Sequence, residues 1–360
     1  MDSDDLARLR LIRTPGVGPV TCRQLLARFG SPEAALAAIP DLARRGGGMP
    51  PRIPDPSVIA KEADRVDRLG ARYLFAGRGL YPALLDAAGG APAALIVRGD
   101  LRLLDSRPIA IVGARNASAA AVRFARQLAS ELGRSGHAIV SGLARGIDTA
   151  AHQGSLESGT AAVVAGGIDI FYPPENEPLQ REIAERGLLI GEQPPGTEPR
   201  ARHFPYRNRI IAGLALGTVV VEAAPKSGSL ISARYAADFG REVMAVPGSP
   251  LDPRAQGCNL LIRDGATLIQ SAADIIEAIG PIAGGVVSQP PSGYGAEPIA
   301  SDASDRDRQT VTALLGPVPV PVDELIRQCG LSPAVVQTVL LELELAGRLE
   351  RHAGGRVSLI

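Results

Sequence analysis

Several short stretches of the sequence carry side chains that could bind an anion. Each follows an apolar run and precedes an expected helix, where backbone N–H groups and Arg or Ser side chains can hydrogen-bond a phosphate. Their glycines let the backbone approach a ligand closely. The residues are Gly113, Arg115 and Asn116, then Ser141, Gly142 and Arg145, and finally Lys226 and Ser227. They predict a phosphate-binding site; the alternative for Arg115 is a salt bridge to a neighbouring loop.

A basic stretch at residues 199–209 carries aromatic side chains between its arginines. The arginines are Arg200, Arg202, Arg207 and Arg209, and Phe204, Tyr206 and Asn208 lie among them. The bases of a single strand are free to stack on aromatic rings while arginines follow the backbone. We therefore predict a basic loop that binds single-stranded nucleic acid, followed by a helix at residues 207–214. The alternative is a solvated loop in which Phe204 fills the core.

Asp148 and His152 are four residues apart in an expected helix, so they share one face of it. They could form an acid–base pair, but no nucleophile or metal ligand accompanies them. We favour a structural hydrogen bond between the two that holds the preceding loop. The GxGxxG, Walker A, HExxH and GxSxG motifs are absent, and Glu222, the clearest carboxylate at a strand end, has no partner carboxylate. No catalytic residue, metal site or cofactor is predicted.

Short apolar runs alternate with helical stretches across residues 76–280, which indicates a parallel sheet covered on both faces. The expected strands lie at residues 109–112, 138–140, 161–164, 188–190, 218–221 and 242–246. We predict an α/β domain with a Rossmann-like doubly wound sheet. Such sheets bind ligands at the carboxyl ends of their strands, where the anion-binding stretches lie.

Two smaller modules are expected beside this domain. Residues 1–75 have apolar residues at helical spacing, and the turn TPGVGP at 14–19 is typical of a helix-hairpin-helix or SAM-like module. A plain packing turn is the alternative. Residues 281–304 are rich in Gly, Pro, Ser and Ala and predict a flexible linker. Residues 305–360 predict helices followed by a small hairpin, the pattern of a winged helix.

Local charge separates the possible DNA-binding surfaces. Residues 305–360 have seven Asp and Glu against six Arg, a net charge of −1, whereas residues 196–209 have four Arg against one Glu, a net charge of +3. A module that reads DNA should be basic. The main site is therefore predicted on the sheet domain, and the LELEL run at 341–345 is better suited to a protein partner.

The overall composition narrows the class of protein. With 38 Lys and Arg against 38 Asp and Glu, the chain has no net charge and no global basic coat for nucleic acid. Cys22, Cys258 and Cys329 form no CxxC pair, so neither a zinc site nor a disulfide framework is indicated. The N-terminus lacks an apolar signal segment, and no apolar run reaches the roughly 18 residues of a membrane span. We expect a cytoplasmic protein with no membrane partner.

Seven motifs follow one another in a characteristic order. They are YP at 81–82, IAIVGAR at 109–115, SGLARGID at 141–148 with His152, YPPEN at 172–176, FPYRNRII at 204–211, SGSL at 227–230 and VPG at 246–248. In this order they resemble the DNA-processing protein A family (DprA, also called Smf). The resemblance covers about residues 75–270 densely, and the flanking modules look similar too.

The resemblance implies a protein that binds single-stranded DNA, protects it and loads the RecA recombinase during DNA uptake in natural transformation. It also implies a homodimer that is not an enzyme. By the same resemblance, Arg115 is the arginine of a Gly-x-Arg motif and a principal phosphate ligand, Ser141 and Gly142 line its pocket, and Phe204 stacks a base. Ala114 departs from the Ser or Thr common at that position, and Lys is common in parts of the family where Arg200 and Arg202 stand.

Two other functions compete with this one. The first is a nucleoside-monophosphate hydrolase of the lysine-decarboxylase-like group, which resembles the chain distantly. Those enzymes carry a PGGxGTxxE motif with a catalytic Glu, whereas the corresponding strand end here reads PKSGSL without that Glu. The second is a transcription regulator built on the winged helix, which the acidic balance of that module disfavours.

Overall fold

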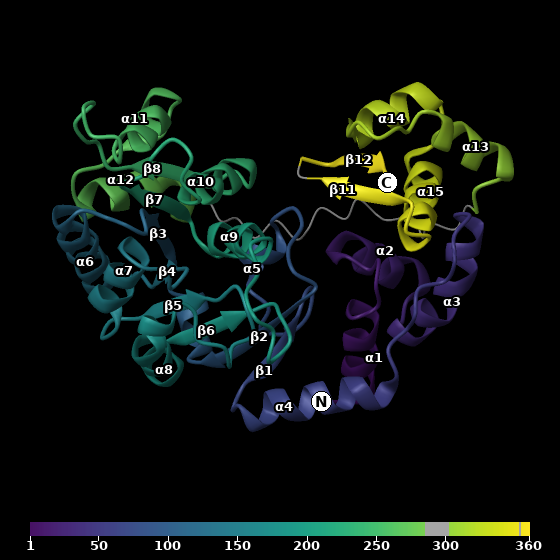
Figure 1. The fold of residues 1–360 in the computed structure, drawn as a ribbon, viewed down its shortest axis with the longest axis horizontal. Coiled ribbons are helices and arrows are strands. Elements are labelled where there is room, and N and C mark those ends of the chain that lie inside the picture. Colours follow the sequence, from purple (N-terminus) through teal and green to yellow (C-terminus); the bar gives the residue numbers. More distant parts are fainter. Residues whose placement is uncertain (285–301, 353) are drawn as a thin grey trace. The chain divides into compact units, whose positions relative to one another are not determined.

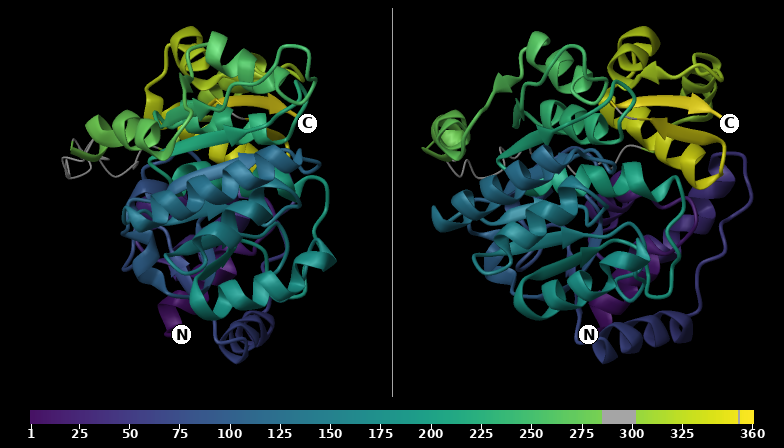
Figure 2. Two further views of the ribbon diagram at one scale, coloured as in Figure 1. Left: turned by 90° about the vertical axis from the view of Figure 1, so that its left-hand side faces the viewer. Right: turned by 60° about the vertical axis from the view of Figure 1, so that its left-hand side comes forward.

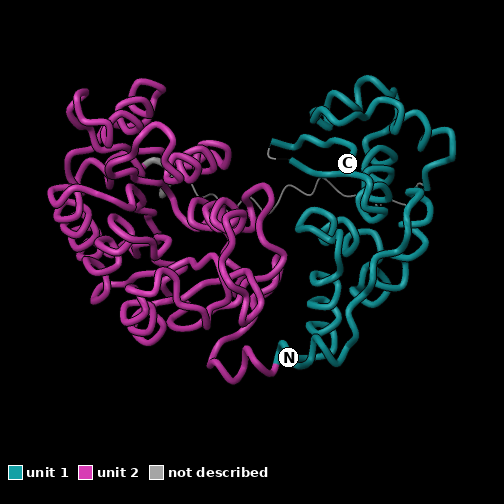
Figure 3. Tube along the Cα trace, in the orientation of Figure 1, with its two compact units in different colours: residues 1–63, 289–360 teal, residues 64–288 magenta. Residues whose placement is uncertain are grey.

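The computed structural model describes residues 1–284, 302–352 and 354–360 (Figures 1 and 2). The chain divides into two compact units, residues 64–288 on the one hand and residues 1–63 with 289–360 on the other (Figure 3). Residues 285–301 of the predicted linker lie outside the described residues. Helix α12 (Ala272–Gly284) extends into the beginning of the predicted linker.

The unit of residues 64–288 is built on one sheet with the strand order β1-β2-β6-β5-β4-β3-β7-β8-β9. Its strands are β1 (Arg72–Phe75), β2 (Ala94–Gly99), β3 (Ile109–Gly113), β4 (Ile139–Ser141), β5 (Thr160–Val163), β6 (Leu188–Gly191), β7 (Gly217–Val221), β8 (Glu242–Ala245) and β9 (Thr267–Leu268). Neighbouring strands from β6 to β9 are parallel, and β1 and β2 add an antiparallel edge. The predicted Rossmann-like doubly wound sheet is confirmed. Because β1 pairs with β2, the sheet begins before residue 76, where the domain was expected to start.

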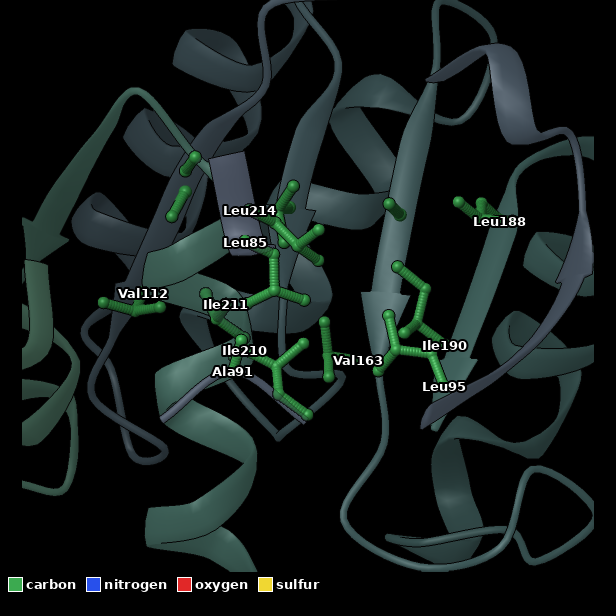
Figure 4. Packing of buried hydrophobic residues seen from close by; sticks show 14 of the residues in the cluster. Leu85, Ala91, Leu95, Val112, Val163, Leu188, Ile190, Ile210, Ile211 and Leu214 are labelled. Atoms are coloured by element: carbon green, nitrogen blue, oxygen red, sulfur yellow. The ribbon is translucent and has the colours of Figure 1, made fainter. Parts of the chain in front are cut away.

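Helices cover both faces of the sheet because side chains on a strand alternate between them (Figure 2). Ile109 and Ile111 pack with α6 (Ala119–Arg134) and α7 (Ile147–Ser155), whereas Val112 packs on the opposite face with α9 (His203–Leu214) and α10 (Ser229–Asp238). Figure 4 shows Val112 near Ile210, Ile211 and Leu214 of α9. The remaining helices of the unit are α4 (Pro56–Arg68), which joins it to the other unit, α5 (Ala83–Asp86), α8 (Glu177–Arg186) and α11 (Gln256–Arg263).

The strand order creates a crevice beside β3. The chain runs outward through β3, β4, β5 and β6, and then returns to form β7 on the other side of β3. Open α/β sheets bind ligands at such a switch point, outside the carboxyl ends of the strands. Here the loops after β3, β4 and β7 meet at that edge.

The second unit combines the two ends of the described chain. Residues 1–63 contribute α1 (Ser3–Ile12), α2 (Pro19–Phe29) and α3 (Pro32–Arg45); the C-terminal part contributes α13 (Asp305–Ala313), α14 (Val322–Cys329), α15 (Pro333–Leu345) and the sheet β10 (Val320–Pro321), β12 (Arg356–Leu359), β11 (Leu349–His352). Three helices with a small antiparallel sheet form the predicted winged helix. The two modules were expected as separate domains, but α15 packs against α3.

Among the described residues, none of the helices combines the length and the apolar character that a bilayer span requires.

Candidate functional site

Two adjoining cavities open at the carboxyl ends of the strands. The larger, about 760 Å³, lies at the switch point between β3 and β7, and we call it the switch-point cavity. The smaller, about 50 Å³, lies toward the loops after β4 and β5, and we call it the inner cavity. Both are lined by Arg115, Ala144, Phe204 and Arg207. These four residues therefore form the boundary between the cavities.

The switch-point cavity brings together stretches that are far apart in the sequence. Of the predicted site residues, it is lined by Gly113, Arg115, Asn116, Phe204, Arg207, Asn208, Lys226 and Ser227. Arg254 and Asp148 also line it. Four cationic side chains thus face the cavity with Asp148 as the carboxylate among its lining residues, so an anion is the ligand that this charge balance favours.

Phe204 lies in the first turn of α9 and is half-buried. The guanidinium carbon of Arg115 lies 5.1 Å from the centroid of its ring, within the range of a cation–π contact. The ring of Tyr172 lies on it in a tilted arrangement, with 5.5 Å between centroids. Phe204 therefore lines both cavities and does not fill the core, the alternative considered for it.

The loop of Arg115 is held against the start of α7 by a close backbone contact. Gly146 has a φ of +74°, and a Cβ there would collide with the carbonyl oxygen of Ala114. The N–H of Ile147 donates to the same oxygen at 3.3 Å. Only glycine allows this approach, so the loops after β3 and β4 are fixed to each other. Arg115 itself is exposed at the rim of the cavities.

Arg207 is a cation buried at the boundary of both cavities. Its Nη1 lies 3.9 Å from Oδ2 of Asp148, which is a loose ion pair, and its Nε has no hydrogen-bond partner. A Cβ at Gly142 would overlap the guanidinium, so that glycine makes room for it. A buried charge is costly unless it is well paired, and an incoming anion would supply the pairing that Asp148 supplies only in part.

Burial dominates the titration of this pair. Desolvation raises the pKa of Asp148, while Arg207 and the backbone N–H of Ala144 act in the opposite direction. Desolvation also lowers the pKa of Arg207; Asp148 opposes that change and the nearby charge of Arg115 adds to it. Arginine stays protonated in proteins, so the site keeps its positive charge.

Asp148 and His152 do not act together. Nδ1 of His152 hydrogen-bonds Oγ1 of Thr160 at 2.7 Å, whereas Asp148 accepts from the N–H of Ala144 at 3.3 Å and faces Arg207. Burial, with a smaller contribution from the charge of Arg207, lowers the pKa of His152 to about 3. The predicted hydrogen bond between the two is wrong, but Asp148 does hold the loop before α7 through Ala144. Neutral His152 is no partner for acid–base chemistry with it.

The predicted basic loop is only partly a loop. Helix α9 begins at His203, four residues before the expected start, so Phe204 and Tyr206 lie in the helix together with Arg207 and Arg209. Arg200 and Arg202 are exposed ahead of it and line neither cavity. The helix packs on the sheet through Ile210 and its neighbours, which buries the polar side chains beside them.

Several predicted residues instead have structural partners. Arg209 donates to the carbonyl of Gly90 and to Glu192, both at 2.6 Å. Ser141 is fully buried, and its hydroxyl donates to the carbonyl of Ile111 at 2.6 Å. The expected hydrogen bond from Ser141 to a phosphate is therefore a wrong prediction, because β4 points that side chain into the sheet.

The remaining predicted residues lie at the cavities with partners of their own. Arg145 lines the inner cavity and pairs with Glu175. Nδ2 of Asn208 donates to the carbonyl of Gly228 at 3.1 Å, which ties α9 to the loop before α10. The hydroxyls of Ser227 and Ser229 are 2.7 Å apart.

Two residues at the site were not singled out from the sequence. Tyr172 stands in the YPPEN motif, and its aromatic ring was the available signal. Arg254 lies in a loop without periodicity, and only the fold brings it to the switch-point cavity, where it pairs with Asp252 at 2.8 Å. Among the described residues, no group of three or more His, Cys, Asp or Glu is placed to hold a metal ion.

The fold and the site define a class of protein: a Rossmann-like domain with a cationic switch-point cavity, accompanied by a helix-hairpin-helix and a winged helix. Residues 72–280 match the family described as DNA recombination-mediator protein A, residues 2–64 match the DprA-like N-terminal HHH domain, and residues 295–355 match the DprA winged helix domain. The chain belongs to the DprA/Smf family.

Known relatives agree with this assignment. The DNA processing protein DprA of Bacillus subtilis is 46% identical over 202 residues, which are 55% of this chain and 68% of the relative. The protein Smf of Escherichia coli is 38% identical over 291 residues, 78% of this chain and 75% of the relative.

Two solved structures share the fold. The DNA processing protein A of Streptococcus pneumoniae superposes with a TM-score of 0.61 at 33% identity, covering 77% of this chain and 98% of that one. The Helicobacter pylori protein, whose structure describes a single-stranded DNA binding mode, superposes with a TM-score of 0.53 at 28% identity, covering 59% of this chain and 96% of that one.

Proposed function

We propose that this chain binds single-stranded DNA at the two cavities, with phosphates at Arg115 and Arg207 and a base against Phe204. The observation that carries the proposal is a half-buried aromatic ring between two cavities, with one arginine against its face and a buried arginine beside it. The bases of a duplex are stacked inward and unavailable to such a ring, so duplex DNA should bind more weakly. The single-stranded DNA binding mode of the Helicobacter pylori relative supports the same ligand.

The first prediction tests Arg115. Arg115→Ala should weaken binding of a labelled oligothymidylate by about 1.5–3 kcal/mol, or roughly 10- to 150-fold, because a charge-assisted contact to phosphate is lost. Fluorescence anisotropy at two salt concentrations measures this, with a matched duplex for comparison, and wild-type binding should fall steeply with salt.

Arg102→Ala is the matched control. Arg102 is 90% exposed, pairs with Asp100 and lies on the turn that precedes β3, at the opposite end of that strand from Arg115. It should leave the affinity unchanged. Equal affinities for Arg115→Ala and the wild type would refute the proposed site.

We further propose that the chain is not an enzyme. Asp148 is the carboxylate lining the switch-point cavity, and it is committed to Arg207 and Ala144. A nucleoside-monophosphate hydrolase would need a carboxylate free to act on its substrate. Incubation with nucleoside monophosphates should release no base, and base release together with absent DNA binding would favour the hydrolase instead.

Family membership supports the wider role. We propose that the chain acts in the cytoplasm as a homodimer that shields incoming single strands from nucleases and passes them to RecA during natural transformation. Sedimentation should give a dimer, and the protein should slow nuclease digestion of a single strand. It should also speed RecA assembly on DNA coated with single-strand-binding protein; no effect in that assay would contradict the RecA step.

A further inference from the structure

Tyr172 presents an exposed aromatic ring at the inner cavity. It lies in the loop between β5 and α8, lines that cavity and is 47% exposed. Its ring contacts that of Phe204, with 5.5 Å between the centroids and 54° between the ring planes. Phe204 itself is half-buried, and Arg115 lies over its ring. Of the two aromatic rings, Tyr172 is therefore the more accessible to a base.

The loop that carries Tyr172 is anchored on both sides of the ring. Ahead of the ring, the carbonyl of Ile170 accepts a hydrogen bond from Nε2 of Gln180 at 3.1 Å. After the ring, Nδ2 of the buried Asn176 donates to the carbonyl of Leu143 at 2.9 Å, which ties this loop to the one after β4. The exposed ring is thus held in position, so less conformational entropy is lost when a ligand stacks on it.

Arginines that could bind phosphate lie beside this ring. Arg145 lines the inner cavity together with Tyr172, and Arg115 lines it as well. Arg145 pairs with Glu175, but the two side chains are 61% and 49% exposed. An exposed ion pair contributes little to stability, so Arg145 can exchange this carboxylate for a phosphate at small cost. Two successive phosphates of a strand could each meet an arginine here.

The two rings cannot both contact bases of one continuous stack. Stacked bases are parallel and about 3.4 Å apart, whereas the planes of Tyr172 and Phe204 are tilted by 54° and their centroids are 5.5 Å apart. Bases that stack on both rings therefore take up a similar tilt and lose their stacking on each other. A strand that stacks weakly, such as oligothymidylate, gives up less in doing so than oligoadenylate, which stacks strongly.

We propose that Tyr172 is a second stacking ring of the DNA site. It takes the base next to the one on Phe204, and the tilt between the two rings makes the site select strands whose bases stack weakly on one another. This inference rests on the proposed function and names the class of strand that the site prefers. The site then recognises two adjacent nucleotides, which a nucleoside monophosphate cannot provide.

The first experiment compares binding of a labelled oligothymidylate by the wild type, Tyr172→Ala and Tyr235→Ala. Tyr172→Ala should weaken binding roughly 5- to 150-fold, the range expected when one stacked base is lost. Tyr235 is the matched control, because it also lies against a phenylalanine, with 5.8 Å between its ring centroid and that of Phe239, but lines neither cavity. Tyr235→Ala should leave the affinity unchanged.

The same proteins test the preference for weakly stacked strands. The wild type should bind oligothymidylate roughly threefold or more tightly than oligoadenylate of the same length. Tyr172→Ala should lower this ratio toward one, while Tyr235→Ala should preserve it. An equal ratio in the wild type and Tyr172→Ala would overturn the preference assigned to the tilted rings.

A fluorescent reporter tests stacking independently of affinity. The chain contains no Trp, so Tyr172→Trp introduces a single indole, which can stack a base as the phenol does. Its affinity for oligothymidylate should stay close to that of the wild type, and saturation with the oligonucleotide should quench its emission. The emission of Tyr235→Trp should not respond.

Arg115→Ala separates this proposal from the proposed function. A loss of affinity in Arg115→Ala, with unchanged affinity in Tyr172→Ala and no quenching in Tyr172→Trp, would overturn the second stacking ring and leave the site intact. Equal affinities of the wild type and Arg115→Ala would instead refute the site itself. Quenching in Tyr172→Trp together with weakened binding in Tyr172→Ala would support both.

Discussion

Arg207 is the buried charge at the site where we propose that DNA binds. The chain as a whole has no net charge, yet this guanidinium is buried with one loose carboxylate partner and an unpaired Nε. A poorly paired buried charge lowers the stability of the protein while the site is empty, and a bound anion would supply the missing pairing. In the proposed site we therefore expect the buried Arg207 to contribute more to anion binding than the exposed Arg200 and Arg202, which line neither cavity.

Phe204→Ala should weaken oligothymidylate binding by about 1–3 kcal/mol, the usual contribution of one base stacked on an aromatic ring. Titration by fluorescence anisotropy measures the loss. Phe239 provides the control, because it is also half-buried but packs on Tyr235 and lines neither cavity. Equal affinities of Phe204→Ala and Phe239→Ala would exclude base stacking at this ring.

His152 should make the stability of the Rossmann-like unit depend on pH. Its pKa is about 3 in the folded chain against an ordinary 6.5, so the unfolded chain binds more protons between those values. The free energy of unfolding should therefore be greatest above pH 6.5 and fall by at most about 1.4 kcal/mol per pH unit as the pH is lowered toward 3.

The contribution of His152 can be measured by urea unfolding of the wild type and of His152→Gln at pH 7 and pH 5. The carboxylates are the same in both proteins, so their contribution to the pH dependence cancels in the comparison. The wild type should lose roughly 2 kcal/mol more than the variant over this interval. Parallel losses in the two proteins would mean that His152 is not buried in its neutral form.

At the scale of elements, the site depends on how closely the loops after β3 and β4 approach α9. Gly142→Ala adds a methyl group that overlaps the guanidinium of Arg207. The guanidinium of Arg207 must then shift away from Asp148, its carboxylate partner, and this overpacking should cost about 1 kcal/mol of stability. The affinity for single-stranded DNA should fall as well, since Arg207 is displaced from the cavities.

Gly89→Ala is the comparison for this variant. Gly89 lines neither cavity, and a Cβ there meets no atom within 4 Å. Thermal unfolding and anisotropy should give wild-type values for Gly89→Ala. A stable Gly142→Ala variant with full affinity would show that Arg207 has more room than its burial indicates.

The sequence predicted the six central strands β3 to β8, because short apolar runs leave little choice once both faces are buried, but it did not predict β1, β2 and β9 at the edges of the sheet. It predicted α9 less well. The arginines and aromatic residues at the start of that helix have the composition of a solvated loop. Arg207 and Arg209 are nevertheless buried in the helix, because Gly142 leaves room for Arg207 and because Gly90 and Glu192 accept hydrogen bonds from Arg209. The role of Ser141 was predicted wrongly for a related reason. Successive side chains at the end of a strand point to opposite faces of the sheet, so a shift of one residue decides whether a hydroxyl faces a ligand or the core.

At the scale of the whole molecule, the flanking modules were recognisable but their docking was not. Gly46 and Gly48 read as an ordinary flexible GGG run, since their partners Glu342 and Ala346 lie some 300 residues away in the sequence. Contacts of that separation leave no local pattern. The division into two compact units could therefore not be predicted from periodicity or composition.

Two compact units should unfold in two transitions. Calorimetry should resolve both, and an oligothymidylate at about 100 times its Kd should stabilise the transition of residues 64–288 by about 2.7 kcal/mol. The other transition should not move. The ligand-induced shift should disappear in Arg115→Ala, and a shift of both transitions together would contradict independent units.

The pairing of α3 with α15 also has a consequence for biosynthesis. During translation, residues 64–288 emerge as one continuous segment and can fold as soon as they leave the ribosome. The N-terminal module emerges earlier, but its partner helix α15 is made only after residues 64–288. Throughout that interval the face of α3 that α15 will bury is open to solvent, so a ribosome stalled before residue 333 would carry a finished Rossmann-like unit and an unfinished first module.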